Sequence, residues 1–174
     1  MTLELERTFL LKELPKGLKD CKSEEFFDIY IPRSVPHPIL RIRKRGDVLE
    51  ITKKSPRSFD AGEQEEKTIP LSEKEFAELS TLPGKRLRKI RHYYPINGRV
   101  AEIDIFLDSL EGLGLVDFEF SSIDEKSGFK MPDFCLADVT QEEFAAGGYL
   151  AGKKYSDIEP FLKKYNYQKL QFKE

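Results

Sequence analysis

The chain has 174 residues, with 29 Lys and Arg against 31 Asp and Glu, so its net charge of −2 gives no general reason to expect nucleic-acid binding. Charged residues make up 34% and hydrophobic residues 39%, which is typical of a globular chain with an unusually high density of charge. This length is enough for a sizeable core, and we expect one domain over residues 1–174 with a helical tail from about residue 153.

The cysteines and the apolar segments indicate the cellular compartment in which the protein resides. Cys21 and Cys135 lie far apart, without the Cys-x-x-Cys or Cys/His spacing of a zinc site, so we expect reduced thiols and leave a disulfide open. The first residues lack the apolar centre of a signal peptide, and no apolar run approaches the roughly 20 residues that cross a bilayer. We therefore predict a cytoplasmic protein with no nucleic-acid or membrane partner, either a monomer or a homodimer.

Strand patterns dominate the chain. Taken in order, strands are predicted at residues 3–10, 26–32, 39–45, 48–54, 63–69, 88–94, 100–106 and 115–121. Helices are predicted at residues 72–80, 140–146 and 158–165, with a short helix or turn at 18–25. Ser72 and Glu75 have capping-box spacing, while Gly46-Asp47 and Asn97-Gly98 are hairpin turn signals. About eight strands joined by short turns indicate a closed antiparallel barrel or a sandwich, with helices outside.

Ionisable side chains recur at every second position of these strands, and alternate positions of a strand share a face. The acidic sets are Glu4 with Glu6, Glu102 with Asp104, Asp117 with Glu119, and Glu66 beside Gln64. The basic sets are Arg41 with Arg43 and Arg45, Lys89 with Arg91, and Lys54 beside Thr52. One interpretation is a half-solvated sheet with cross-strand ion pairs. The other is a barrel with a polar interior, in which grouped carboxylates hold Mg²⁺ or Mn²⁺ and grouped cations hold phosphate oxygens.

The order of these pieces resembles the CYTH proteins, also called triphosphate tunnel metalloenzymes. The pieces are Glu4-Leu5-Glu6, Leu40-Arg41-Ile42-Arg43, Ile51-Thr52-Lys53-Lys54, Lys89-Ile90-Arg91, Glu102-Ile103-Asp104, Asp117-Phe118-Glu119 and Asp138-Val139-Thr140. Together they extend over most of the chain, from residue 3 to about residue 150. The resemblance implies an α+β fold: a closed eight-stranded antiparallel β-barrel that forms a tunnel with a charged interior and helices packed outside.

The resemblance also implies roles for individual residues. Metal ligands would be Glu4, Glu6, Glu66, Asp104, Asp117 and Glu119, with Glu102 as a further member of the shell. The residues that bind phosphates would be Arg41, Arg43, Lys54, Lys89 and Arg91, with Arg45 a weaker candidate. The catalytic set would be Glu4, Glu6, Lys89 and Arg91. The implied cofactor is Mg²⁺ or Mn²⁺, and the implied partner is a small-molecule triphosphate.

Two positions depart from the family pattern. Thr8 stands where the N-terminal signature has Lys, and strand alternation points Arg7 to the opposite face, so Arg7 is no substitute. Gln64 stands where an acid is expected beside Glu66. These departures leave substrate preference and rate open.

Three functions follow. The leading hypothesis is a metal-dependent hydrolase of tripolyphosphate, a nucleoside triphosphate or thiamine triphosphate. The first alternative is a class IV adenylate cyclase, since Asp28-Ile29-Tyr30 and the segment Leu107 to Gly114 are similar to that branch. The second is a binder of polyphosphate or nucleotides without catalysis, a hypothesis that Thr8 and Gln64 favour.

Overall fold

A computed structural model describes residues 2–172, so Met1, Lys173 and Glu174, the ends of the predicted domain, lie outside the described part. Within it the strands are β1 (Thr2–Leu11), β2 (Ser23–Ile31), β3 (Leu40–Arg45), β4 (Val48–Pro56), β5 (Glu63–Pro70), β6 (Lys85–Ile96), β7 (Arg99–Phe106), β8 (Gly114–Glu119) and β9 (Cys135–Asp138). The α-helices are α1 (Glu73–Leu79), α2 (Ile123–Gly128), α3 (Gly147–Leu150) and α4 (Tyr155–Lys163). Short 3₁₀ helices span Leu18–Asp20, Asp108–Leu110 and Glu143–Ala145.

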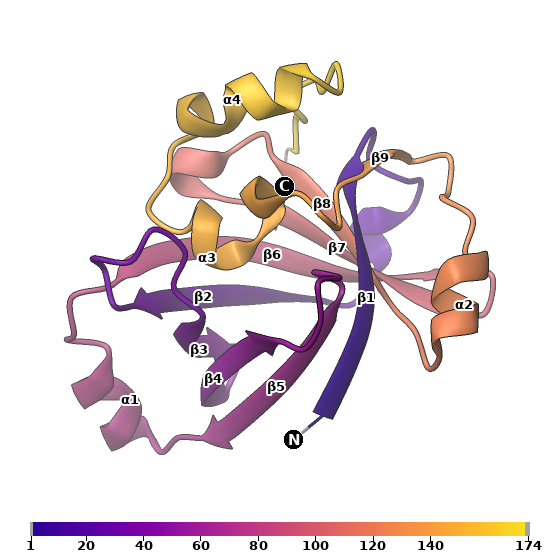
Figure 1. Ribbon diagram of the computed structural model, residues 1–174. Helices are drawn as coiled ribbons and strands as arrows, with labels where there is room; N and C mark the ends of the chain where they lie inside the picture. The colour runs from indigo at the N-terminus through magenta and orange to yellow at the C-terminus, as the bar shows by residue number, and fades with distance from the viewer. Residues whose placement is uncertain (1, 173–174) are drawn as a thin grey trace.

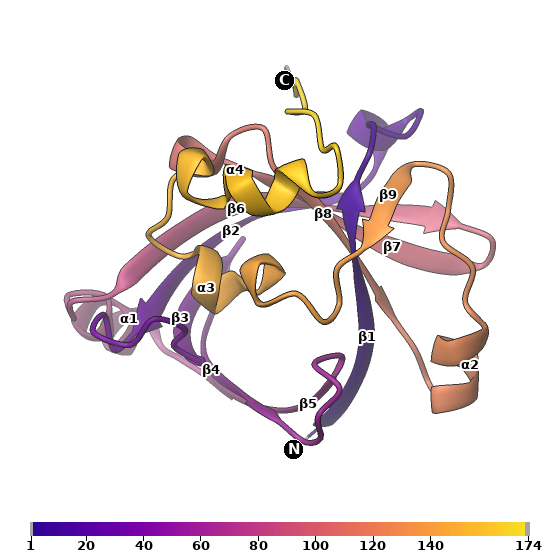
Figure 2. The ribbon, with the colours of Figure 1, turned by 45° about the horizontal axis from the view of Figure 1, so that its top comes forward.

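Eight of the strands close into a ring. Their order is β5-β4-β3-β2-β6-β7-β8-β1, and β1 pairs back with β5, every neighbouring pair being antiparallel. The short strand β9 adds to the edge of β1 beyond its pairing with β5. The central opening of the ring is visible in Figures 1 and 2. The predicted closed antiparallel barrel is therefore confirmed, and the sandwich alternative was wrong.

Local sequence explains the turns and the first helix. Asn97 and Gly98 both have positive φ, at 49° and 75°, as a two-residue hairpin turn between β6 and β7 requires. Ser72 caps α1 by accepting from the Glu75 amide, and the Glu75 carboxylate accepts from the Ser72 amide in return. Both predictions are confirmed, because each depends on residues adjacent in sequence.

The prediction of a helix at residues 140–146 was wrong. Only Glu143–Ala145 forms a 3₁₀ turn, and α3 begins at Gly147. Thr140 instead donates its hydroxyl to Asp138 Oδ1, at 2.5 Å, and its Oγ1 accepts from the Thr8 amide. Such bonds from a short side chain compete with helix formation, so this segment follows β1 before it turns.

Other elements differ in extent or were not foreseen. The predicted helix 158–165 begins earlier, as α4 at Tyr155, and in the predicted helix or turn at 18–25 only Leu18–Asp20 is helical. Neither β9, with four residues, nor α2, with six, was predicted. Segments this short do not display a full hydrophobic period, which is the signal used to predict such elements.

Two apolar clusters surround the barrel interior. The first covers the outer face of β1, β7 and β8, where residues such as Phe9, Ile103 and Phe118 are fully buried in one cluster with Phe129 and Phe134 of the segment that follows α2. The second lies where α3 and α4 pack across one end of the barrel, and it includes Tyr30 and Phe106. Phe9, Ile103 and Phe118 thus face outward, as the polar-interior interpretation required. Among residues 2–172, no helix combines the length and apolar character needed to span a membrane.

Candidate active site

The barrel encloses a cavity of about 670 Å³. All the side chains predicted for the site line it: Glu4, Glu6, Arg41, Arg43, Arg45, Lys54, Glu66, Lys89, Arg91, Glu102, Asp104, Asp117 and Glu119. Strand alternation placed them on one face of each strand, and closure of the barrel turns that face inward.

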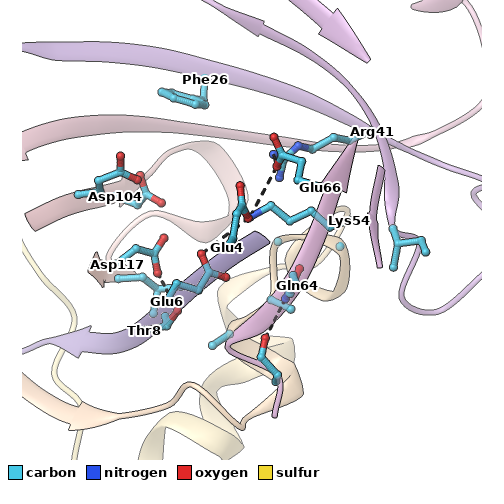
Figure 3. A pocket seen from close by; sticks show the side chains of 18 of the residues that line it. Glu4, Glu6, Thr8, Phe26, Arg41, Lys54, Gln64, Glu66, Asp104 and Asp117 are labelled. Atoms are coloured by element: carbon cyan, nitrogen blue, oxygen red, sulfur yellow. Dashed lines mark hydrogen bonds and ion pairs between the residues drawn. The ribbon is translucent and has the colours of Figure 1, made fainter. Parts of the chain in front are cut away.

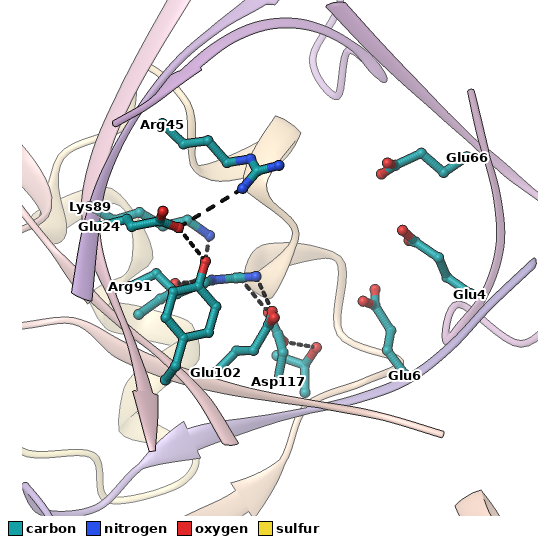
Figure 4. Close-up of polar contacts among 12 residues, drawn as sticks. Glu4, Glu6, Glu24, Arg45, Glu66, Lys89, Arg91, Glu102 and Asp117 are labelled. Atoms are coloured by element: carbon teal, nitrogen blue, oxygen red, sulfur yellow. Dashed lines mark hydrogen bonds and ion pairs between the residues drawn. The ribbon is translucent and has the colours of Figure 1, made fainter. Parts of the chain in front are cut away.

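Three carboxylates form one wall of the cavity. Glu4 and Glu6 on β1 and Glu66 on β5 lie in a row facing the interior (Figure 4). Lys54 reaches into this row from β4, and its Nζ lies 2.5 Å from Glu4, 3.8 Å from Glu6 and 3.8 Å from Glu66 (Figure 3). Glu66 also faces Arg41, with Nη2 3.5 Å from its carboxylate. We call Glu4, Glu6 and Glu66 the acidic wall.

The acidic wall carries more negative charge than Lys54 balances. Burial raises the pKa of Glu4, and repulsion from Glu66 and Glu6 adds to this effect against the attraction of Lys54. Burial also disfavours the charged form of Lys54, but Glu6 and Glu4 outweigh it and raise the pKa of that amine. The lysine is therefore held as a cation among acids that still repel each other, a charge balance that an added cation would relieve.

The opposite wall pairs cations with acids. Arg91 binds Asp104 through two hydrogen bonds of 2.7 Å, lies 3.1 Å from Asp117 and also bonds Glu102. Lys89 donates to the same Asp104 carboxylate, which is almost fully buried. Burial opposes ionisation of Asp104, but Arg91 and Lys89 outweigh it and hold its pKa well below the usual range. Asp104 is thus the shared anion of two buried cations.

Some acids on this side remain poorly balanced. Burial raises the pKa of Glu102 to about 7, with repulsion from Asp117 and Asp104 adding to the effect against Arg91. Burial and the nearby Glu6 likewise raise the pKa of Asp117. Burial, with Arg91 nearby, lowers the pKa of Lys89 although Asp104 opposes this.

A buried acid and an aromatic ring support the basic side chains. Asp28 on β2 accepts from Arg43 Nε and Nη2, both at 2.7 Å, and is 1% exposed. The Phe26 ring lies under Arg43, Lys89 and Arg91, whose cationic groups are 4.6, 5.7 and 5.2 Å from its centroid. Neither Asp28 nor Phe26 was predicted as a site residue. Both share a strand face with Tyr30, which also lines the cavity.

The two departures from the family pattern have definite partners. Thr8 donates its hydroxyl to Asp117 Oδ1 at 2.7 Å, and Gln64 Nε2 turns to the carbonyl of Ala61 at 2.9 Å (Figure 3). Arg7 points away from the cavity, as alternation predicted, and it pairs with Asp138 at 2.6 Å. Thr8 therefore adds no charge where a lysine would place one.

The chemistry of the acidic wall fits a divalent cation. Carboxylate oxygens are the ligands that Mg²⁺ and Mn²⁺ prefer, and three carboxylates of this wall lie around the amine of Lys54. As the side chains lie, the described residues include no group of three or more acidic, histidine or cysteine side chains close enough to hold a metal ion. The amine of Lys54 lies among these acids, so a metal ion would have to replace that amine beside the carboxylates.

A charged cavity inside a closed β-barrel defines a tunnel-type fold. Comparison with known proteins places it more narrowly. An inorganic triphosphatase of Nitrosomonas europaea is 28% identical over 142 residues, which cover 80% of this chain and 91% of that protein. A crystal structure of an inorganic triphosphatase aligns with a TM-score of 0.65 at 27% identity, covering 88% of this chain and 97% of the other.

More distant structures share the fold alone. A candidate adenylyl cyclase of Hippeastrum with a dominant triphosphatase activity has a TM-score of 0.52 at 13% identity, over 98% of this chain and 92% of that one. A candidate adenylate cyclase of Bacillus halodurans has a TM-score of 0.54 at 16% identity, over 100% and 96%. No protein-family model matches the chain. The similarity to inorganic triphosphatases at 27 and 28% identity confirms the predicted resemblance to the CYTH, or triphosphate tunnel, proteins.

Proposed function

We propose that this protein hydrolyses a small-molecule triphosphate inside the barrel with the help of a divalent metal. One observation carries the proposal: cations and carboxylates from seven strands converge on a single enclosed cavity, with Glu4, Glu6 and Glu66 grouped on one wall. A triphosphate needs cations along its chain and metal ions at its oxygens, and this cavity offers side chains for both. The similarity to inorganic triphosphatases supports the same reaction.

The basic side chains would hold the phosphate chain. Arg41, Arg43, Lys54, Lys89 and Arg91 all reach the cavity, and a guanidinium can bind two phosphate oxygens at once. Arg43 is held by Asp28 through Nε and Nη2, and neither of these bonds uses Nη1. Phosphoryl transfer is accelerated mainly by positioning and charge, so cations fixed in advance by Asp28 and Asp104 are suited to it.

Glu4, Glu6 and Glu66 would hold the metal, with Asp117 and Glu119 reaching toward it from β8. When bound, a divalent cation supplies positive charge that neutralises phosphate oxygens and polarises the terminal phosphorus. Asp104, also predicted as a ligand, has its carboxylate bonded to Lys89 and Arg91. Its proposed part is to fix those two cations.

A product assay tests the proposal. The protein is incubated separately with tripolyphosphate, ATP and thiamine triphosphate, each with Mg²⁺ or Mn²⁺, and the products are identified. We expect free phosphate from at least one substrate and its loss in Glu4→Gln, which keeps the side-chain volume of the acidic wall but removes one charge. Cyclic AMP with pyrophosphate would instead establish the cyclase reaction.

A second candidate function is binding without turnover. It is favoured by Thr8, which is neutral and bonded to Asp117, and by Gln64, which is turned toward the Ala61 carbonyl. In this case a triphosphate would raise the melting temperature of the protein while no product formed in any of the incubations. Phosphate release by the unmodified protein would exclude it.

A further inference from the structure

The barrel wall has a seam on β1. Along one edge, β1 pairs with β5 through residues 2–5 and with β9 through residues 9–11. No strand of the described residues pairs with the stretch between them on that edge, which holds Glu6 and Thr8. Both residues point into the cavity, so the seam lies directly behind part of the acidic wall.

Loop atoms close this seam in place of a strand. The Glu6 amide donates to the Gly62 carbonyl at 2.9 Å, and the Thr8 amide donates to Thr140 Oγ1 at 3.0 Å. The Val139 amide donates to the Thr8 carbonyl at 2.8 Å. The backbone position of Glu6 therefore depends on where the loop between β4 and β5 lies.

Asp60 ties the two sides of the seam together. Its Oδ1 accepts from the Gly62 amide at 2.8 Å and from Gln141 Nε2 at 2.7 Å, and its Oδ2 accepts from Lys126 Nζ at 2.7 Å. Gln141 also contacts this loop through its Oε1, which accepts a hydrogen bond from the Ala61 amide at 3.1 Å. One carboxylate thus joins the β4–β5 loop, the segment after β9 and helix α2.

The close packing at this junction explains why residue 62 is a glycine. A Cβ on residue 62 would lie 2.3 Å from the Glu6 carbonyl, 2.7 Å from Lys126 Nζ and 2.9 Å from Thr140. Since real Cβ atoms do not approach so near, only glycine lets the loop touch β1 here. Burial opposes ionisation of Asp60, but hydrogen bonds from Lys126, Gln141 and the Gly62 amide outweigh it and lower its pKa. The junction thus holds a charged Asp60.

We propose that Asp60 is a positioning residue, which sets Glu6 and Thr8 in the cavity by clamping Gly62 and the Thr140–Gln141 segment onto the seam. It touches neither substrate nor metal and acts only through the backbone of β1. This inference rests on the proposed function, because it gives Asp60 its effect through the triphosphate site. Outer partners that fix a binding residue commonly matter by about 10-fold or more in affinity.

Three variants separate positioning from general stability. Asp60→Ala removes every bond of the carboxylate, whereas Asp60→Asn keeps an oxygen for Gly62 and Gln141 but loses the charge facing Lys126. Phe59→Ala is the matched control, because Phe59 lies next to Asp60 on the same loop and its side chain is fully exposed.

Amide hydrogen exchange, resolved by residue with NMR, is measured first and requires no ligand. In Asp60→Ala we expect exchange at Glu6 and Thr8 to accelerate about 10-fold or more while amides in the β6–β7 hairpin keep their rates. Asp60→Asn should fall between Asp60→Ala and the unmodified protein, and Phe59→Ala should match the unmodified protein. Unchanged exchange at Glu6 and Thr8, or an equal acceleration in the hairpin, would overturn the proposal.

The second measurement is calorimetric titration with imidotriphosphate, an analogue that resists hydrolysis, in the presence of Mg²⁺. We expect Kd to rise about 10-fold in Asp60→Ala and to stay unchanged in Phe59→Ala. Faster exchange at Glu6 with unchanged Kd would reduce Asp60 to a structural role and refute positioning. If the unmodified protein itself does not bind the analogue, the proposed function fails, and the exchange rates still decide whether Asp60 holds β1.

Discussion

Replacing Asp104 with Asn should destabilise the protein severely, because it removes the anion shared by Lys89 and Arg91. The Asp104 and Lys89 side chains are only 2% and 11% exposed, so water cannot replace the lost partner. Removing one member of a buried ion pair costs about 3–5 kcal/mol, and we expect about 3 kcal/mol because Asn keeps the volume and one acceptor oxygen. Since domains unfold with about 5–15 kcal/mol, the variant should still fold.

Urea unfolding followed by circular dichroism measures this loss as a shift in midpoint at constant slope. Glu25→Gln is the control, because Glu25 and its partner Arg88 have side chains that are 52% and 39% exposed, and such surface pairs contribute about 0–1 kcal/mol. A loss below about 1 kcal/mol in Asp104→Asn, or an equal loss in the control, would refute the view that Asp104 neutralises two buried cations.

The pH dependence of Asp104→Asn gives an independent check. Burial already lowers the pKa of Lys89 from 10.5, and without Asp104 it should fall further. Between that lower value and 10.5, unfolded Lys89 binds a proton that folded Lys89 does not, so stability increases with pH. The difference between the variant and the unmodified protein should therefore narrow as the pH rises from the Lys89 pKa of the folded variant to that of the folded unmodified protein, which itself lies below 10.5. A constant difference would mean that Lys89 is not the group left unpaired.

Three further predictions concern other parts of the molecule. Burial lowers the pKa of His92 from 6.5, so stability should be lost as the pH falls from 6.5 through the folded value, and thermal melts of His92→Phe should lose that component of the pH dependence. Phe9→Ala should cost about 3–5 kcal/mol in urea unfolding, because Phe9 is fully buried against other aromatic rings; a loss below 1 kcal/mol would contradict this packing. Thr8→Lys with Gln64→Glu restores the charges of the family pattern, so phosphate release from tripolyphosphate should rise at least about 10-fold, and an unchanged rate would show that neither position limits turnover.

Several features of the site could be predicted from sequence because they depend on the two-residue period of a strand. Glu4 and Glu6 had to share a face, and Arg7 had to leave it, whatever the strand later packed against. Residues that face each other across a tight hairpin could also be predicted. The Asn97-Gly98 turn brings Arg91 opposite Asp104 in the register of β6 and β7. These relations extend over at most a few residues or one tight turn.

Other contacts depend on residues that are distant in sequence. Asp28 was not singled out for the site, because nothing local shows that the second strand pairs with the third and places Arg43 on this acid. The helix predicted at residues 140–146 failed for the same reason, since Thr140 bonds to Thr8 across the barrel wall. The sequence of the loop around Asp60 did not indicate the role of this residue, because its partner Lys126 lies on a helix that was not predicted.

The sequence by itself determined which side chains share a face of each strand and therefore which charges could meet. Alternation along a strand is a property of the backbone and needs no partner. Only the tertiary structure decided that β1 pairs with β5, which closes the sheet, turns the charged faces of the site inward and sets Lys54 among the carboxylates of Glu4, Glu6 and Glu66. Strand order and closure depend on how all the apolar outer faces can be buried together, and that is a property of the whole chain.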